Sequence, residues 1–226
     1  MSLLLLDQLL VVSGANSTWE TLNSEIISLH KKKHTKWIYD FGEQGMTGCI
    51  NSKGKIILIG GETYDIHFEV TKSKNCWIYD DIISVYPKLI KMLEKRPWSS
   101  STLIHNELIW IVGGEGNHSD LSSTELLDIH SGESEHGINL PFTIRSHCAV
   151  EYKEQAIYIM GGIQNGEASS KTWIVNPDKD FEIVKGPRLK FARYSHSCGK
   201  MEWDGEVVLI VAGGYDGKKA LKFEFC

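Results

Sequence analysis

A glycine pair that recurs after apolar runs is the feature that most constrains the fold of this chain. Four copies read KIILIGG, LIWIVGG, AIYIMGG and VVLIVAGG, and a fifth, LLVVSGA, has Ser13 in place of its first glycine. The second positions of the five pairs are residues 14, 61, 114, 162 and 214, which are 47, 53, 48 and 52 residues apart. A period of this size predicts a repeat protein, in which each repeat buries its apolar face against its neighbours.

Each repeat contains short β-like runs separated by turns. The turns that precede the glycine-pair strands are Lys53-Gly54, His105-Asn106, Lys153-Glu154 and Asp204-Gly205. Such turns between two β-like runs predict tight hairpins. A third run follows at 75–80, 124–129 and 171–177, and a fourth at 36–41 and 181–187. Four antiparallel strands per repeat predict an all-β fold in which each repeat is one blade of a β-propeller.

Two segments depart from this pattern. In the second repeat, the segment from Asp81 to Trp98 replaces a short fourth strand, and we expect a brief helix or a long loop there. The first twelve residues, MSLLLLDQLLVV, resemble a signal peptide, but they lack a basic n-region and Asp7 interrupts them. We therefore expect a β-hairpin of the first blade at this end. The chain has no apolar run long enough for a membrane-spanning helix.

Crowding near the axis of a propeller explains the glycine pairs. The strand before each pair ends where bulky side chains would collide and where the bend requires a positive φ, so glycine is favoured. The glycines assigned to this structural role are Gly60, Gly61, Gly113, Gly114, Gly161, Gly162, Gly213 and Gly214. The unbroken apolar strands are predicted to be buried on both faces between blades. Trp37, Trp77 and Trp173 are predicted to pack between blades as well.

With these features the sequence resembles the kelch-repeat family of β-propellers. The resemblance rests on the glycine pairs, on Arg145-Ser146-His147 and Arg193-Tyr194-Ser195-His196 before first strands, and on Trp77-Ile78-Tyr79-Asp80 in a third strand. It covers nearly the whole chain and implies one kelch-type propeller over 1–226. The approximate blades are 1–42, 45–97, 98–143, 144–190 and 191–226, the last of them incomplete. We expect four to five blades of four antiparallel strands here, as part of a six-bladed ring, because an open edge exposes unpaired backbone groups; the alternative is a five-bladed ring that closes imperfectly.

Charge and cysteine content limit the function classes. The 24 basic and 29 acidic side chains give a formal net charge of −5, which argues against a nucleic-acid or anionic-membrane partner. The odd set of cysteines lacks a CxxC motif and is expected to consist of buried thiols in a reducing compartment, which favours the cytoplasm. These are Cys49, Cys76, Cys148, Cys198 and Cys226. Two glycosylation sequons, at Asn16 and Asn117, leave an extracellular location open if a signal peptide precedes Met1.

The candidate binding site is the face that carries the loops after the glycine pairs and the segments leading into first strands. Antiparallel alternation within a blade puts both at the same end. A polar rim with aromatic residues suits a peptide or a protein loop. The residues expected to bind such a partner are Glu62, Tyr64, Asp65, Glu115, Asn117, His118, Arg145, Gln164, Asn165, Arg193, Tyr215 and Asp216. The alternative for each is a solvated turn residue, and the two arginines could instead link blades through backbone carbonyls.

A non-enzymatic protein-interaction module is the function expected from this sequence, with no cofactor and no metal. His147 and His196 occur at equivalent blade positions, with Cys148 and Cys198 one and two residues after them, and they are expected to be structural because they belong to different blades. The competing class is a small-molecule enzyme similar to sialic acid mutarotases, which also use kelch propellers. That hypothesis would place four side chains at the mouth of the central channel of the propeller, namely Arg145, Arg193, Glu62 and Glu115.

Overall fold

A computed structural model describes residues 44–222 except 52, 66, 68, 81–85, 106 and 153–155, together with the backbone of short strands outside this range. The chain forms two compact units, Met1–Pro97 and Trp98–Cys226, which we call unit 1 and unit 2. Helical structure in the described part is limited to a 3₁₀ turn at Pro177–Lys179. No helix in that part is long and apolar enough to cross a membrane.

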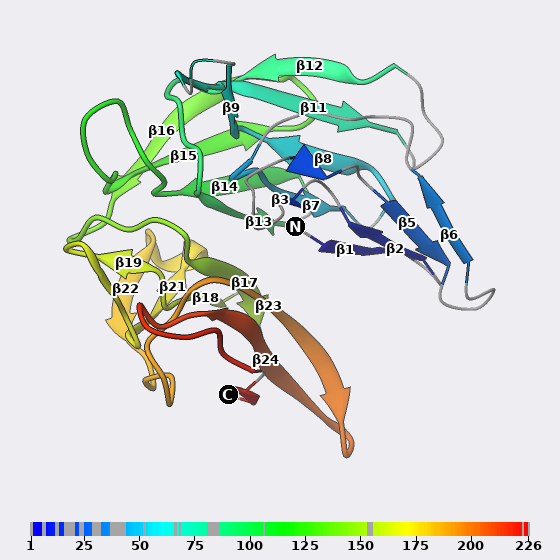
Figure 1. The fold of residues 1–226 in the computed structure, drawn as a ribbon. Coiled ribbons are helices and arrows are strands. Elements are labelled where there is room, and N and C mark those ends of the chain that lie inside the picture. The colour runs from blue at the N-terminus through cyan, green and yellow to red at the C-terminus, as the bar shows by residue number, and fades with distance from the viewer. Residues whose placement is uncertain are drawn as a thin grey trace. The chain divides into compact units, whose positions relative to one another are not determined.

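Antiparallel sheets make up both units (Figure 1). Unit 1 contains the sheets β1-β2-β5-β6 and β7-β8-β11-β12, and unit 2 contains β13-β14-β15-β16, β17-β18-β21-β22 and β23-β24-β25. We call these sheets blades one to five. Their strands in unit 1 are β1 (Ser2–Leu5), β2 (Gln8–Val11), β5 (Glu25–Ser28), β6 (Lys33–Lys36), β7 (Thr47–Ile50), β8 (Ile56–Ile59), β11 (Asn75–Tyr79) and β12 (Lys88–Lys91). Those in unit 2 are β13 (Ser100–Ile104), β14 (Leu108–Val112), β15 (Ser123–Asp128), β16 (Ser134–Asn139), β17 (Cys148–Tyr152), β18 (Ala156–Met160), β21 (Thr172–Asn176), β22 (Glu182–Lys185), β23 (Tyr194–Trp203), β24 (Glu206–Tyr215) and β25 (Glu224–Phe225).

Small hairpins follow three of the glycine-pair positions, formed by β3 (Gly14–Ala15) with β4 (Thr21–Leu22), β9 (Glu62–Tyr64) with β10 (Val70–Lys72), and β19 (Ile163–Gln164) with β20 (Glu167–Ala168). The predicted all-β fold with four-stranded antiparallel repeats is confirmed. The expected hairpin at the N-terminal end is also confirmed, since β1 pairs with β2. The structure shows no closed ring, so the number of blades in the complete propeller stays a prediction.

The expectation of a helix or long loop in place of a fourth strand in blade two is wrong. Strand β12 pairs with β11, with Ile90 opposite Cys76. Within β12 the Ile90 side chain alone is buried, and its neighbours Lys88, Leu89 and Lys91 are exposed. One inward apolar residue gives too short an alternation to be recognised as a strand. In blade one the sequence predicts the fourth strand at 36–41, whereas the observed fourth strand, β6, ends at Lys36.

The second strands form the core of blades two, three and four, as their unbroken apolar sequences predict, whereas in β24 of blade five only Leu209 and Val211 are buried. All four residues of β8 are fully buried, as are Ile109 to Val112 in β14. In unit 2, Trp110, Ile144 and Ile159 belong to one cluster that joins blades three and four. Trp173 of blade four stacks on Phe142 with ring centroids 4.5 Å apart, which confirms its predicted packing between blades. Burying each large apolar side chain contributes roughly 1.5–3 kcal/mol to stability.

Three residues at the beginnings of first strands, two of them just before β13 and β17 and the third the second residue of β23, adopt the left-handed conformation and hydrogen-bond to one another from blade to blade. They are Trp98 (φ 61°), Ser146 (φ 51°) and Ser195 (φ 51°). Ser146 N donates to Trp98 O and Ser195 N donates to Ser146 O, both at 2.8 Å. First strands of successive blades in unit 2 accordingly lie beside each other, β13 beside β17 and β17 beside β23. This backbone chain fixes the spacing of the three blades.

The glycine pairs meet these lead-in segments, by which we mean residues 96–99, 144–147 and 193–196. A Cβ on Gly113 would lie 2.3 Å from Ile144 O, and a Cβ on Gly161 would lie 2.7 Å from Arg193 O. The second glycine of each pair donates to the same carbonyl, from Gly114 to Ile144 at 2.9 Å and from Gly162 to Arg193 at 2.8 Å. The eight predicted structural glycines all have positive φ. Both reasons predicted for glycine, crowding and a positive φ, therefore hold at Gly113 and Gly161.

Gly113→Ala is expected to destabilise the protein by roughly 3 kcal/mol or more, because the new methyl group collides with the Ile144 carbonyl at a positive φ. Gly166→Ala is the matched control: Gly166 also has a positive φ (80°), but no described atom lies within 4 Å of a Cβ there. The control should lose only about 1 kcal/mol. Urea unfolding measures both values. Equal losses for the two variants would show that blade contact does not set the requirement for glycine at 113.

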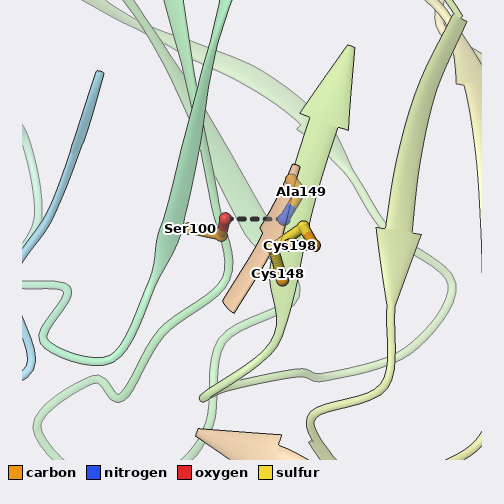
Figure 2. The surroundings of a disulfide bond; sticks show 4 residues. All are labelled: Ser100, Cys148, Ala149 and Cys198. Atoms are coloured by element: carbon orange, nitrogen blue, oxygen red, sulfur yellow. Dashed lines mark hydrogen bonds between the residues drawn. A yellow bond between two sulfur atoms is a disulfide. The ribbon is translucent and has the colours of Figure 1, made fainter. Parts of the chain in front are cut away.

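A disulfide between Cys148 and Cys198 joins β17 of blade four to β23 of blade five (Figure 2). The two Cα atoms are 6.0 Å apart, within the range that a disulfide spans. Beside it, Ala149 N donates to Ser100 Oγ at 2.8 Å, which links β17 to β13 on the other side. The expectation that these two cysteines are buried free thiols is therefore wrong. Of the described cysteines, Cys49 and Cys76 are not part of a disulfide.

The Cys148→Ser/Cys198→Ser double variant should lose about 2–4 kcal/mol of stability, because the disulfide closes a loop of 50 residues in the unfolded chain. Reduction of the native protein should lower its free energy of unfolding by a similar amount, and its melting temperature should fall as a result. The double variant serves as the control, and its melting temperature should not respond to reductant. A reductant-insensitive native protein would contradict the assigned pairing.

Candidate binding face

Three loops of unit 2 leave the glycine pairs at the same end of their blades, because each follows the second strand of an antiparallel sheet. We call residues 115–120, 163–168 and 215–220 the post-glycine loops. The first and third are closed by single antiparallel bridges, Glu115 to Asp120 and Tyr215 to Ala220. The second is the hairpin of β19 and β20, in which Gln164 pairs with Glu167.

Backbone hydrogen bonds join these loops into one surface. In each blade the carbonyl of the second glycine accepts the N–H of the residue at which the loop returns. These bonds run from Leu121 to Gly114, from Ser169 to Gly162 and from Leu221 to Gly214, each at 2.9 Å. The carbonyl of the returning residue then accepts from the next lead-in segment, from Ile144 to Leu121 at 3.0 Å and from Arg193 to Ser169 at 3.1 Å. We call the resulting surface of unit 2 the loop face.

Arg145 and Arg193 do not occupy equivalent positions, although both begin a motif that ends in histidine. Arg193 lies three residues before His196, and Arg145 lies two residues before His147. In the structure Arg193 takes the place held by Ile144 in blade four, since each carbonyl accepts from the second glycine of the preceding blade. Arg193 and Ile144 are accordingly both buried, with exposed fractions of 1% and 0%. Arg145 instead matches Tyr194, one residue further on.

Arg145 connects two blades through side chains. Its Nη1 donates to Glu115 Oε2 at 2.7 Å, and its Nε lies 2.9 Å from Asp120 Oδ1. Both carboxylates belong to the post-glycine loop of blade three. The three side chains are partly exposed, so the network contributes about 1 kcal/mol at most. It holds the loop of blade three against the lead-in segment of blade four.

Arg193 has a structural position inside blade five. Its Nη1 donates to Gly213 O at 2.9 Å and to Lys222 O at 3.0 Å. Hydrogen bonds from a buried charged donor to carbonyls contribute about 1.5–3 kcal/mol. The guanidinium therefore closes the base of the loop at 215–220. It matches the carbonyl-bonding alternative from the sequence, except that both carbonyls lie in its own blade.

Solvent exposure divides the other residues expected on this face. Asn117, His118, Asn165 and Tyr215 are exposed, whereas Gln164 is buried, with 7% of its surface exposed. Tyr215 meets Tyr194 edge to face, with ring centroids 5.8 Å apart. The exposed residues are those that remain available to a partner in unit 2.

Aspartates in these loops stabilise turns. Asp216 accepts from the N–H groups of Lys218 and Lys219, both at 2.8 Å. The Lys219 N–H, followed by that of Lys218, lowers the pKa of Asp216. In unit 1, Asp65 accepts in the same way from His67 at 2.8 Å and Glu69 at 2.9 Å. Glu62 in β9 is buried, and the Tyr64 side chain lies outside the described part.

Two residues of the loop face were not predicted from the sequence. Asp120 binds Arg145 from the far end of the loop, six residues after Gly114. Tyr194 meets Tyr215, but in the sequence it stands between Arg193 and His196, where its neighbours do not mark it as a binding residue. The signal that could have found Tyr194 is the one-residue offset between the two arginine motifs.

His147 and His196 are buried at equivalent positions in blades four and five, and they interact electrostatically although they belong to different blades. No described group hydrogen-bonds to their ring nitrogens at normal geometry. Burial, with a smaller effect from His196, lowers the pKa of His147 to about 3. Burial and the Arg193 charge lower that of His196 to about 4, against a smaller opposing effect of the Met160 backbone. The two imidazole rings are therefore neutral at physiological pH. The His196 ring also packs against the glycine pair of blade four, since a Cβ on Gly161 would lie 2.6 Å from His196 Cε1.

Across the described residues, His, Cys, Asp and Glu side chains form no group of three or more that could hold a metal ion. Cys148 and Cys198, which come one and two residues after these histidines, are joined in a disulfide. The structural role predicted for the two histidines thus rests on their packing against the glycine pairs.

Comparison with known proteins supports a kelch-like family. The chain is 28% identical over 175 residues to alpha-scruin of Limulus polyphemus, and 22% identical over 167 residues to the spermatocyte protein spe-26 of Caenorhabditis elegans. Each match covers 73% of this chain but only 18% of alpha-scruin and 28% of spe-26. Both relatives are kelch-repeat proteins. No protein-family model matches the chain. Together with the four-stranded antiparallel sheets, these similarities support a kelch-like family and a β-propeller fold.

The buried histidines should make stability fall with pH below their unfolded pKa of 6.5. Between that value and about 4 the unfolded chain binds protons that the folded chain does not, so each histidine costs about 1.4 kcal/mol per pH unit. Urea unfolding from pH 7 to 5 measures the slope. His147→Gln and His196→Gln should each reduce it. A pH-independent stability over this range would contradict the burial of neutral imidazoles.

Proposed function

We propose that this chain is a non-enzymatic module that binds another protein or peptide through the loop face of unit 2. The observation that carries the proposal is the set of exposed polar and aromatic side chains on loops whose bases are fixed by backbone hydrogen bonds. A rigid surface loses little conformational entropy when a partner binds. The kelch-repeat relatives support a protein-binding role of this kind.

Within the loop face we assign the central contacts to blades four and five. Tyr215 is 38% exposed and is held at its edge by Tyr194, which leaves one of its surfaces to a partner. Tyrosine contributes a large contact area with few rotatable bonds and dominates many interfaces. Asn165, exposed at the tip of the β19–β20 hairpin, adds an amide beside a polar rim.

Arg145 and Glu115 are assigned to the rim. Because each is already engaged by the other, they guide the orientation of a charged partner and contribute little affinity. Arg193, Gln164 and Asp216 are assigned to support of the loops. Glu62, Tyr64 and Asp65 of unit 1 remain predicted contacts of a propeller that spans 1–226 with the blade limits given above.

The competing enzyme hypothesis needs guanidinium groups that a small anionic sugar can reach. Arg193 is buried and donates to two backbone carbonyls, while Arg145 is paired with two carboxylates. Neither arrangement favours binding of such a substrate. Protein binding is the function that these contacts support.

Tyr215→Ala is expected to weaken partner binding at least tenfold, because it removes the most exposed aromatic contact of the loop face. Trp203→Ala is the matched control, since Trp203 is 58% exposed at the opposite end of the same β23–β24 hairpin. The measurement is recovery of partners by the immobilised protein from extract, followed by titration of the recovered partner. Equal binding by both variants and the native protein would contradict the assignment.

A further inference from the structure

We propose that Asn117 is an N-glycosylation site and that this chain matures in an oxidising secretory compartment. The proposal goes beyond protein binding and rests on two separate observations, the shape of one post-glycine loop and the disulfide between two blades. The ligand class is an N-linked oligosaccharide, attached covalently to the Asn117 side chain.

The sequon occupies the exposed tip of its loop. Asn117, His118 and Ser119 are exposed, whereas Gly116 on one side is buried and Asp120 on the other is partly buried. A hydrogen bond from Gly116 N to Ser119 O, 2.9 Å long, places Asn117 and His118 at the turn itself. The acceptor amide and the Ser119 hydroxyl that the transferase must recognise therefore both project from the protein surface.

The Cys148–Cys198 disulfide gives independent support for the compartment. Structural disulfides form and persist in oxidising compartments and are rare where thiols are kept reduced. The other described cysteines do not compete with this pair in thiol–disulfide exchange. Cys76 is fully buried, and burial raises the pKa of the Cys49 thiol to about 12, so neither supplies a reactive thiolate.

Both modifications have balanced chemistry with ordinary co-reactants of that compartment. The Asn117 amide nitrogen bonds to the anomeric carbon of an oligosaccharide carried on a lipid diphosphate. The bond from that carbon to the phosphate oxygen breaks, the lipid diphosphate leaves, and the amide gives up one proton. The two thiols lose two protons and two electrons to the disulfide of an oxidoreductase, which becomes a dithiol.

A glycan on Asn117 would cover the tip of the blade-three loop. Direct partner contact at Asn117 and His118, expected from the sequence, would then be replaced by sugar. The protein surface left for a partner would lie in blades four and five, where Tyr215 and Asn165 are exposed. Failure of the glycan assignment would leave the test of Tyr215 untouched, so the two proposals fail separately.

The test is peptide mapping by mass spectrometry of the full-length protein that contains this chain, expressed in cultured animal cells. Free thiols are blocked before lysis with a membrane-permeant maleimide. We expect the peptide carrying Asn117 to bear a glycan, and the peptides of Cys148 and Cys198 to be recovered as a disulfide-linked pair. Site-specific mapping separates Asn117 from the second sequon at Asn16.

Matched variants of the loop tip sharpen the result. Asn117→Gln and Ser119→Ala should each abolish the modification at this site, whereas His118→Ala should retain it because the middle position of the sequon is variable. An unmodified Asn117 in the native protein would overturn the glycan assignment. Maleimide on Cys148 and Cys198 in intact cells would overturn the assigned compartment.

Discussion

Close approach between a glycine pair and the next lead-in segment is the contact on which unit 2 depends. At each of the two junctions, one carbonyl accepts from the second glycine and excludes a side chain from the first. The left-handed residues Trp98, Ser146 and Ser195 continue the contact as a chain of backbone hydrogen bonds. Because backbone atoms meet backbone atoms, the blade spacing hardly depends on the variable side chains around it. The repeat sequence can therefore vary from blade to blade while the blades remain regular.

This junction also positions the candidate binding face. The post-glycine loops start at the second glycine and return to its carbonyl, and the returning residue binds the following blade. Loop tips such as 117–119 and Asn165 project from a base that is fixed at both ends. Side chains then tune each loop separately: Arg145 holds the loop of blade three with a charge network, and Arg193 holds that of blade five through carbonyls. The two arginines act differently because one residue separates their positions in the lead-in segments.

Much of the architecture was predictable because strand periodicity and turn chemistry are local properties. The apolar runs before the glycine pairs, the third strands and the N-terminal hairpin were all predicted from patterns a few residues long. Strand β12 was missed because only Ile90 points inward and the strand is held by its pairing with β11. The disulfide was missed for a related reason: Cys148 and Cys198 are 50 residues apart, and their distance depends on how two blades stack. Spacing along the chain contains no information on that distance.

The sequence by itself determined the repeat, the strand content and the need for glycine, since each follows from residue type and local spacing. It also placed the sequon at Asn117 and the polar loops after the glycine pairs. Tertiary structure alone decided which of the candidate residues reach solvent, which arginine is buried and which cysteines pair. These outcomes depend on the register between blades, where a shift of one residue exchanges a buried position such as that of Ile144 and Arg193 for a surface one such as that of Arg145. Such a register is set by hydrogen bonds between distant backbone groups and cannot be read from either segment alone.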